Sequence, residues 1–220
     1  MIKIERTPTP PPSLASEKVK VNGNYRESDV MRQLAEDFHE KCYLCEIDEL
    51  QSIEVEHLYP HGGDKNLKFD WGNLFLSCAH CNSVKNQGKY HGVILDCCKV
   101  DPESVLNQQF LNDHVSVQPT ADMKAAVMTA ELLTECFEKK NTGIRIMECQ
   151  TRINALRKTM NLLYKTLEQY RNSPSGRTLS ILRRMLSRTY KFAGFTRAYV
   201  RNHLETYPSA YRYGRCAPFL

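Results

Sequence analysis

The sequence predicts an α+β protein, in which a small core of two short strands and one helix precedes an all-helical C-terminal region. Two Cys-x-x-Cys pairs, Cys42/Cys45 and Cys78/Cys81, lie on either side of a segment with short, strand-like apolar runs. From Thr120 onward the apolar residues recur instead with the 3.6-residue period of a helix. We therefore expect the core to lie before residue 120 and the helical region to follow it.

The first 25 residues are expected to form an extended, proline-rich arm. The run from Thr7 to Pro12 contains four prolines, and proline lacks an amide donor and restricts the residue before it. These residues should therefore stay close to the polyproline II conformation. Two interpretations remain open, a loose leader and an arm that lies against the rest of the chain or against a partner.

A helix should begin with Ser28 as its cap and run to about His39, because Val30, Leu34 and Phe38 form one apolar stripe. The segment 52–58 alternates like a strand. Strict alternation separates Glu56 from His57, so their side chains can converge only if the chain bends near Pro60, His61, Gly62 and Gly63.

The rest of the predicted core follows from short local signals. Residues 74–77 should form a returning strand, and a helix should start at Asn82 with Lys85 one turn along. Asn112 and Asp113 form a turn signal, and Val115 and Val117 indicate another short strand.

The C-terminal region begins with a predicted helix that ends near residues 141–143. Its apolar positions are Met123, Ala126, Val127, Ala130 and Leu133. The next helix carries a heptad seam of Ile146, Cys149, Ile153, Leu156, Met160, Leu163, Leu167 and Tyr170. This seam can pack locally against the preceding helix, pair with a second copy of the chain, or dock on a partner.

Beyond the break at residues 173–176, we expect a helix from about Arg177 to Phe192 that places Arg184, Arg188 and Lys191 on one face. Gly194 should separate it from a last helix that stops before Pro208. These elements lie in a strongly basic tail. Residues 171–220 hold ten lysines and arginines and one acidic residue, although the net charge of the whole chain is only +5.

A basic tail is typical of proteins that bind nucleic acid or an acidic partner, with a solvated surface as the plainer alternative. The aromatic residues of the tail would suit stacking on bases. They are Tyr190, Phe192, Phe195, Tyr199, Tyr207, Tyr211 and Tyr213.

Composition also predicts where the protein works. No apolar run approaches the roughly eighteen residues of a membrane span, and no apolar stretch typical of a secretory signal follows the N-terminus. The nine cysteines are an odd number and the paired ones have metal-ligand spacing, so we expect a cytoplasmic protein without a disulfide framework. The remaining cysteines are expected to be small buried residues: Cys97, Cys98, Cys136, Cys149 and Cys216.

The two cysteine pairs predict a structural zinc site, since four thiolates complete a tetrahedral coordination shell. His80 lies inside the second pair and is expected to stay outside that shell. A second set of residues does not belong to the zinc site and has the composition of a hydrolytic metal centre. It consists of Glu56, His57, Asn73 and Asn82.

In this order and spacing, the segment from Cys42 to Lys85 resembles the HNH endonucleases. The shared pattern is Cys-x-x-Cys, an acidic-His pair followed by Pro, Asn-Leu, and Cys-x-x-Cys-Asn-x-x-Lys. The resemblance implies a zinc-stapled ββα-metal core, with His57 as the general base and Asn73 holding its loop. It implies Glu56 and Asn82 as ligands of a catalytic cation, and Lys85 and His61 as phosphate contacts.

Two residues depart from the common family pattern. Many HNH members carry Asp where this chain has Glu56, and many carry His where it has Asn82. One carboxylate and one amide oxygen favour Mg²⁺ or Mn²⁺ over Zn²⁺ at that position.

A narrower resemblance extends to the opening M-I-K-I-E-R-T-P and to V-I-L-D-C-C-K-V-D-P-E after the core. These segments are similar to the HNH subunits of retron-associated and Septu anti-phage systems. That resemblance implies a defence nuclease with an ATPase partner, and for the retron-associated members a reverse transcriptase with its RNA and DNA product. The implied substrate is nucleic acid, with DNA favoured and RNA such as tRNA left open.

The sequence thus predicts three regions: an N-terminal arm of residues 1–25, an HNH nuclease domain of residues 26–120, and a helical C-terminal domain of residues 121–220 with a basic tail. Two other functions remain as alternatives. The chain would then be a zinc-knuckle module that binds nucleic acid without cutting it, or a subunit that serves assembly.

Overall fold

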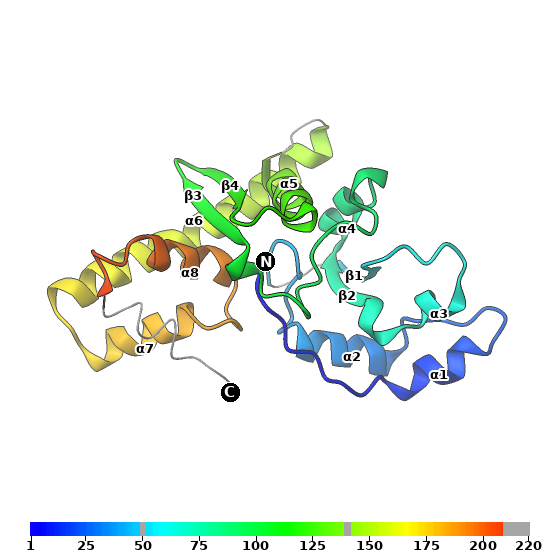
Figure 1. The fold of residues 1–220 in the computed structure, drawn as a ribbon. Coiled ribbons are helices and arrows are strands. Elements are labelled where there is room, and N and C mark those ends of the chain that lie inside the picture. Colours follow the sequence, from blue (N-terminus) through cyan, green and yellow to red (C-terminus); the bar gives the residue numbers. More distant parts are fainter. Residues whose placement is uncertain (49–51, 139–141, 209–220) are drawn as a thin grey trace.

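The computed structural model describes residues 1–48, 52–138 and 142–208. The fold mixes α and β structure, with two small antiparallel sheets and several helices (Figure 1). Its first part contains α1 (Pro12–Lys18), α2 (Ser28–Asp37), β1 (Ile53–His57), α3 (Lys65–Lys68), β2 (Leu74–Cys78) and α4 (Ala79–Lys85). The second part contains β3 (Leu106–Leu111), β4 (His114–Pro119), α5 (Lys124–Glu138), α6 (Gly143–Asn172), α7 (Gly176–Met185) and α8 (Ala193–Asn202).

The first sheet pairs β1 with β2, in a register that sets Ile53 opposite Cys78 and His57 opposite Leu74. Helix α4 packs against both strands and α2 against β2. The predicted stripe of α2 is confirmed, because Val30, Leu34 and Phe38 are fully buried.

Two helix starts differ from the prediction. Ser28 is the first residue of α2, and Glu27 is the N-cap without a side-chain cap bond. Helix α4 starts at Ala79 rather than at Asn82, because the Cys78 sulfur accepts a hydrogen bond from the Cys81 amide and caps it. A predicted zinc ligand therefore also caps the start of the helix.

The N-terminal segment lies against the body of the protein rather than forming a loose leader. Met1, Ile2 and Ile4 are buried, and the Ile4 amide donates to the Cys97 carbonyl at 3.1 Å. The run from Thr7 to Pro11 is not helical, as predicted, but the chain turns into α1 at Pro12. Proline suits this first helical position because its missing amide hydrogen has no partner there.

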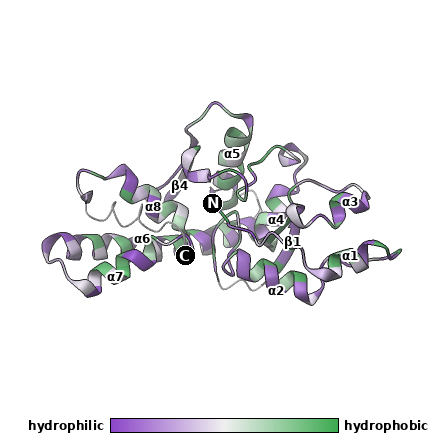
Figure 2. Ribbon diagram, turned by 60° about the horizontal axis from the view of Figure 1, so that its bottom comes forward, coloured by the Kyte–Doolittle hydropathy of each residue, from purple (hydrophilic) through white to green (hydrophobic). Residues whose placement is uncertain are grey.

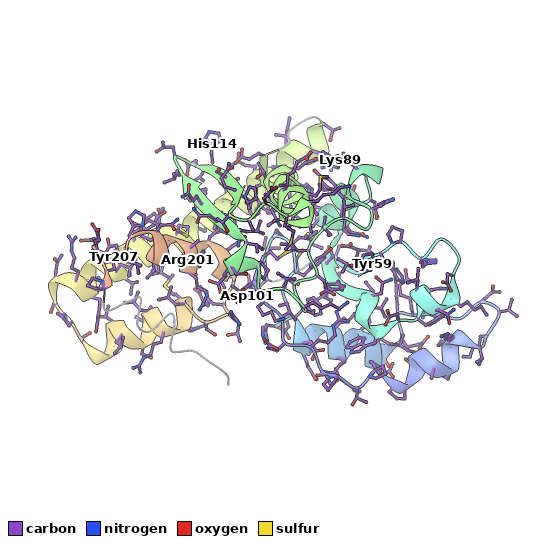
Figure 3. All side chains as sticks on the ribbon, viewed as in Figure 1. Tyr59, Lys89, Asp101, His114, Arg201 and Tyr207 are labelled. Carbon is purple, nitrogen blue, oxygen red and sulfur yellow. The ribbon has the colours of Figure 1, made fainter. Side chains whose placement is uncertain are left out.

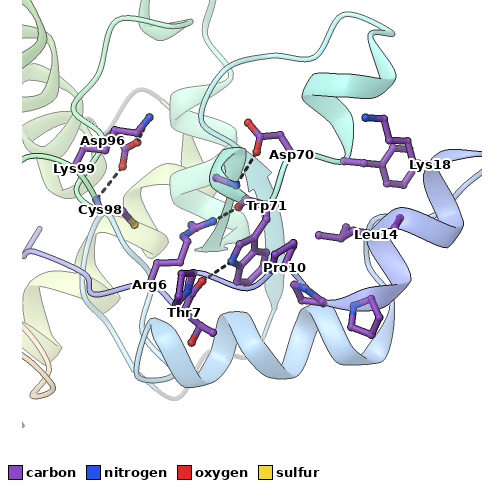
Figure 4. A pocket seen from close by; sticks show the side chains of 16 residues that line it. Arg6, Thr7, Pro10, Leu14, Lys18, Asp70, Trp71, Asp96, Cys98 and Lys99 are labelled. Carbon is purple, nitrogen blue, oxygen red and sulfur yellow. Dashed lines mark hydrogen bonds and ion pairs between the residues drawn. The ribbon is translucent and has the colours of Figure 1, made fainter.

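Arg6 holds the arm in place (Figure 4). Its guanidinium donates to the carbonyls of Trp71 and Leu74 and lies over the rings of Phe38, Trp71 and Phe75. The Trp71 indole in turn donates to the Thr7 carbonyl at 2.9 Å.

The second sheet is a hairpin of β3 and β4, of which the sequence predicted only the second strand. Asn112 and Asp113 form its two-residue turn with φ values of 50° and 64°. Positive φ at both positions is characteristic of the type I′ turn that suits the twist of two paired strands. Helix α5 packs on β4 and α8 packs on β3.

The heptad seam of α6 packs inside the molecule, against α5, α7 and α8. Six of its eight residues are buried, namely Cys149, Ile153, Leu156, Met160, Leu163 and Leu167. Ile146 is 48% exposed and Tyr170 is partly buried. Figure 2 shows hydrophobic and hydrophilic residues alternating along α6 and α7. Local packing is therefore the alternative that the structure supports, and the seam needs no second copy of the chain.

The stripe predicted for α5 is only partly correct. Ala126, Ala130 and Leu133 are buried, but Met123 and Val127 are 40% and 46% exposed. Met123 precedes the helix, and Val127 lies on a solvent-exposed side of it. Thr142, inside the helix end predicted at residues 141–143, caps α6 by accepting from the Arg145 amide. Asn141 lies outside the described residues.

The predicted helix over residues 177–192 is too long. Helix α7 ends at Met185, so Arg188 and Lys191 lie beyond it and do not share a helical face with Arg184. The chain turns between α7 and α8, where the Lys41 ammonium donates to the carbonyls of Arg188 and Tyr190.

Gly194 lies inside α8 rather than before it. A Cβ atom at this position would lie 2.3 Å from the Gln108 side chain and 2.6 Å from that of Glu46. Glycine therefore lets α8 approach β3 and the first cysteine pair closely.

Four basic residues of the tail pair with acidic residues of the body, and Figure 3 labels Arg201 among them. Arg197 and Arg201 contact Glu103, Arg188 contacts Asp101 and Glu103, and Lys191 contacts Asp48. Among the tail aromatics, the ring of Tyr199 packs with those of Tyr164, His203 and Tyr207. Tyr211, Tyr213 and Cys216 lie outside the described residues.

The buried apolar residues form one cluster that runs from Met1 to Val200. The division predicted at residue 120 stays a prediction, since side-chain packing is continuous on both sides of it. None of the helices in residues 1–48, 52–138 and 142–208 combines the length and the apolar character that crossing a membrane requires.

Candidate functional site

The four predicted zinc ligands come together from two turns of the chain. Cys42 and Cys45 lie in a tight turn closed by a 2.9 Å bond from the Glu46 amide to the Cys42 carbonyl. Cys78 ends β2 and Cys81 lies in the first turn of α4. All four are buried, and their sulfur atoms lie within 4.8 Å of one another.

This cluster fits a closed zinc site. Four sulfurs at about 2.3 Å from a zinc ion lie about 3.8 Å apart, and the Cys45 and Cys78 sulfurs are 4.0 Å apart. Among the described residues, this is the one group of three or more histidine, cysteine or acidic side chains whose ligand atoms are close enough to hold a metal. The group can therefore hold a metal such as zinc.

His80 stays outside the sulfur cluster, as predicted. It is 9% exposed, and its Nε2 lies 2.9 Å from the Cys136 carbonyl, to which it donates. The ring thus connects α4 to α5 and leaves the coordination shell to the four cysteines.

Arg152 of α6 is part of this site, and sequence reasoning missed it. Its Nη2 donates to the Cys78 sulfur at 3.0 Å, and Nη1 donates to the Glu148 carboxylate at 2.7 Å. The residue is 4% exposed. Burial alone would lower the pKa of Arg152, but negative charge on the sulfurs of Cys45, Cys81 and Cys78 raises it above its usual value. The guanidinium therefore stays charged beside the sulfurs.

His57 ends β1 in a half-buried position. Its Nε2 lies 3.0 Å from the Lys68 carbonyl, and since a carbonyl only accepts, Nε2 carries the proton and Nδ1 has the free lone pair. Burial lowers the pKa of His57, and the nearby His61, Lys85 and Arg26 add to that effect, whereas the bond to Lys68 opposes it. The ring is therefore neutral near pH 7 and can accept a proton at Nδ1.

Asn73 joins the two sides of the loop that follows His57. Its Oδ1 accepts from the Tyr59 amide at 2.7 Å, and its Nδ2 donates to the carbonyls of Tyr59 and Leu67 at 2.9 and 3.0 Å. The side chain is 2% exposed. The predicted bend occurs here, with Gly62 and Gly63 at φ values of 53° and 92°.

Glu56 points away from His57 into the protein, so the bend does not bring the two side chains together. The Lys85 ammonium lies 2.5 Å from Oε1, and the Tyr43 hydroxyl donates to the same atom at 3.0 Å. Glu56 is 3% exposed. Burial raises the pKa of Glu56 to about 7, although Lys85 and Tyr43 pull it down.

Lys85 is 1% exposed, which differs from the surface position that a phosphate contact needs. Its ammonium contacts Glu56 and donates to the His57 carbonyl at 2.9 Å. Lys85 therefore fixes the backbone at His57 from inside the protein. His61 lies closer to the surface, with its ring centroid 4.8 Å from that of His57.

Glu56 and Asn82 are the residues predicted to hold a hard cation. The Oε2 atom of Glu56 is buried without a hydrogen-bond partner, and such an atom is typically satisfied by an ion or a water molecule. Asn82 lies one turn before Lys85 on α4, so both side chains face the same side. Carboxylate and amide oxygens suit Mg²⁺ or Mn²⁺. The described contacts link Asn82 only to Asn86.

No protein-family model matches this chain. A stretch of 96 residues is 34% identical to the Septu protein PtuB of Bacillus thuringiensis. This match supports a relationship to Septu proteins. The aligned stretch makes up 39% of this chain and only 37% of the relative. The chain thus spans little more than a third of the relative's length.

Proposed function

We propose that this protein is an HNH endonuclease that hydrolyses phosphodiester bonds of nucleic acid in defence against phage. The geometry of His57 carries the proposal. Its Nε2 donates to the Lys68 carbonyl, and the loop beyond it is held by Asn73. A neutral imidazole with a free Nδ1 on a fixed loop is what a general base requires.

In the proposed reaction, Nδ1 of His57 takes a proton from a water molecule. The water oxygen then forms a bond to phosphorus while the bond from phosphorus to the leaving oxygen breaks, and solvent protonates that oxygen. A bound Mg²⁺ or Mn²⁺ would supply charge neutralisation on the phosphoryl oxygens. Within the chain, Lys85 holds the His57 carbonyl, while Asn73 keeps the loop from moving away. The zinc knuckles serve only to hold these elements together.

The match to a Septu protein supports the defence role. By that likeness, and by the retron-associated resemblance of the flanking segments, we propose that the chain works beside an ATPase. If the chain belongs to a retron system, we propose that its partners also include a reverse transcriptase and the RNA and DNA product of that enzyme. The seam of α6 is used internally, so a partner would have to use another surface.

A His57→Ala variant tests the enzyme against the non-catalytic binder. Plasmid DNA and tRNA would be incubated with the protein in Mg²⁺, with and without a candidate ATPase. Cleavage should fall by roughly a hundredfold, the usual contribution of a positioned base. Zinc content and melting temperature should match those of the parent.

His114 provides the matched control, because its side chain is 72% exposed at the start of β4, away from the knuckles (Figure 3). His114→Ala should cut as the parent does. If His57→Ala also cut as well as the parent, the proposed mechanism would be wrong. If the parent bound nucleic acid but cut neither substrate under any of these conditions, the binding module would be the better description.

A further inference from the structure

The loop between α1 and α2 contributes a side chain to the His57 site. Tyr25 lies on this loop, and its ring centroid is 4.7 Å from that of the His57 imidazole, with an angle of 69° between the planes. This edge-to-face arrangement is a favourable geometry for two rings. Tyr25 is partly buried against the apolar core, so its position is determined by packing.

The same loop also accepts hydrogen bonds from two lysines of α3. The Lys68 ammonium donates to the Gly23 carbonyl at 2.9 Å, and the Lys65 ammonium donates to the Lys20 carbonyl at 2.6 Å. Lys68 also provides the carbonyl that accepts from His57. One residue therefore links the catalytic ring to the N-terminal segment.

Helix α1 determines the shape of this loop. A Cβ atom at Gly23 would lie 1.9 Å from the Glu17 carbonyl oxygen, so only glycine allows this approach. The Glu17 carboxylate accepts from the Asn24 amide at 2.9 Å and pairs with Lys20. Residues on both sides of Gly23 are thus held by one side chain.

The imidazole of His57 needs more than its hydrogen bond to keep a fixed plane. The bond from Nε2 to Lys68 limits where that atom lies, but the ring can still rotate about the direction of the bond. The rings of Tyr25 and His61 lie beside it, with centroids 4.7 and 4.8 Å from that of the imidazole. The cations of Arg26 and Lys68 lie 5.3 and 5.8 Å from the Tyr25 centroid and favour its position further.

We propose that Tyr25 is a positioning residue that keeps Nδ1 of His57 directed at the attacking water. The N-terminal segment, through α1 and its loop, is then a part of the active site. This inference rests on the proposed nuclease function for its kinetic consequence, but the placement of the two rings can be tested without it.

The kinetic test compares Tyr25→Ala with Tyr25→Phe. Loss of the ring should lower kcat about tenfold with little change in KM, because a misdirected base slows chemistry while substrate contacts remain. The phenylalanine variant should restore the parent value, since the ring alone is required. Tyr164→Ala removes a partly buried tyrosine that packs on Tyr199, away from this site, and should leave kcat unchanged.

Nuclear magnetic resonance of the His57 ring protons supplies the second readout. A tyrosine ring at 4.7 Å shifts these resonances, so they should move in Tyr25→Ala and stay close to the parent in Tyr25→Phe. If Tyr25→Ala does not fold, Tyr25→Leu takes its place. If the parent does not cut nucleic acid but the His57 resonances still move in Tyr25→Ala, the result would contradict the nuclease proposal and leave the role of Tyr25 in place. Unchanged resonances and unchanged kcat in the alanine or leucine variant would overturn the role of Tyr25, as would a phenylalanine variant as impaired as the alanine one.

Discussion

Nη2 of Arg152 lies 3.0 Å from the sulfur of Cys78, although the two residues are 74 positions apart. A zinc ion with four thiolates carries a net charge of about −2. A buried negative charge is costly unless an opposite charge lies beside it. Arg152 provides that charge, and because it belongs to α6, it also joins the long helix to the cysteine cluster.

Replacing Arg152 by Met should weaken the zinc site and the fold together. We expect a loss of about 2–3 kcal/mol, the usual scale for a buried hydrogen bond to a charged group, and a fall in Tm of roughly 5–10 °C. Zinc should pass to a chelator faster than from the parent. Arg157→Met is the control, since Arg157 is on the same helix in an exposed pair with Asp113, and such pairs contribute little. Equal zinc loss in both variants would contradict the role of Arg152.

Asn82→Ala should reduce cleavage through the affinity for the cation. Raising Mg²⁺ or Mn²⁺ should therefore recover part of the activity, whereas the same titration should leave His57→Ala inactive, because no added cation replaces a base. The measurement is cleavage rate against metal concentration. Recovery of both variants, or of neither, would show that Asn82 and His57 do not have separate roles.

Glu56 should impose a pH dependence on stability. Its pKa is raised from 4.5 to about 7 by burial, so the folded state holds this proton more tightly than the unfolded state. Its contribution to the free energy of unfolding is greatest below pH 4.5 and is lost as the pH rises to about 7. Glu56→Gln does not titrate, so the difference in Tm between variant and parent should change across this range. A constant difference from pH 4.5 to 8 would contradict the shifted pKa.

Glu103 should hold α8 and the turn before it on the body of the protein. Three arginines of the tail contact its carboxylate, which is 9% exposed. Glu103→Ala leaves Arg197, the most buried of them, without this partner, and we expect a loss of about 2 kcal/mol and a fall in Tm of roughly 5 °C. Glu205→Ala, an exposed acid beyond α8, should leave Tm unchanged. A thermal shift measurement on both variants decides the point.

The paired arginines also change how the basic tail must be tested. If the tail binds a polyanion, neutralising Arg184, Arg188 and Lys191 together should weaken that binding. Arg188 and Lys191 contact Asp101, Glu103 and Asp48, so the same change removes internal ion pairs. A loss of binding would therefore have to be compared with the loss of stability.

Several features of this protein followed from the sequence alone, because they depend on local spacing. Each Cys-x-x-Cys pair places two thiols near each other, and the two pairs together predicted the shared metal site. The stripe of α2 and the seam of α6 follow from the 3.6-residue period. The short strands on either side of Asn73 were visible from apolar runs and turn residues. The exact ends of some elements differed from the prediction. Helix α4, for example, starts three residues early because Cys78 caps it.

Only the tertiary structure decided which charged and aromatic side chains meet. Arg152 looks in the sequence like any exposed residue beside an apolar seam, and Tyr25 lies in a loop of polar residues. Their partners, Cys78 and His57, are 74 and 32 positions away, and no local period reports such a contact. The same holds for Lys85, whose burial against Glu56 replaced the surface position expected from the motif. Long-range contacts depend on how elements pack against one another, and the local pattern of residues does not contain that information.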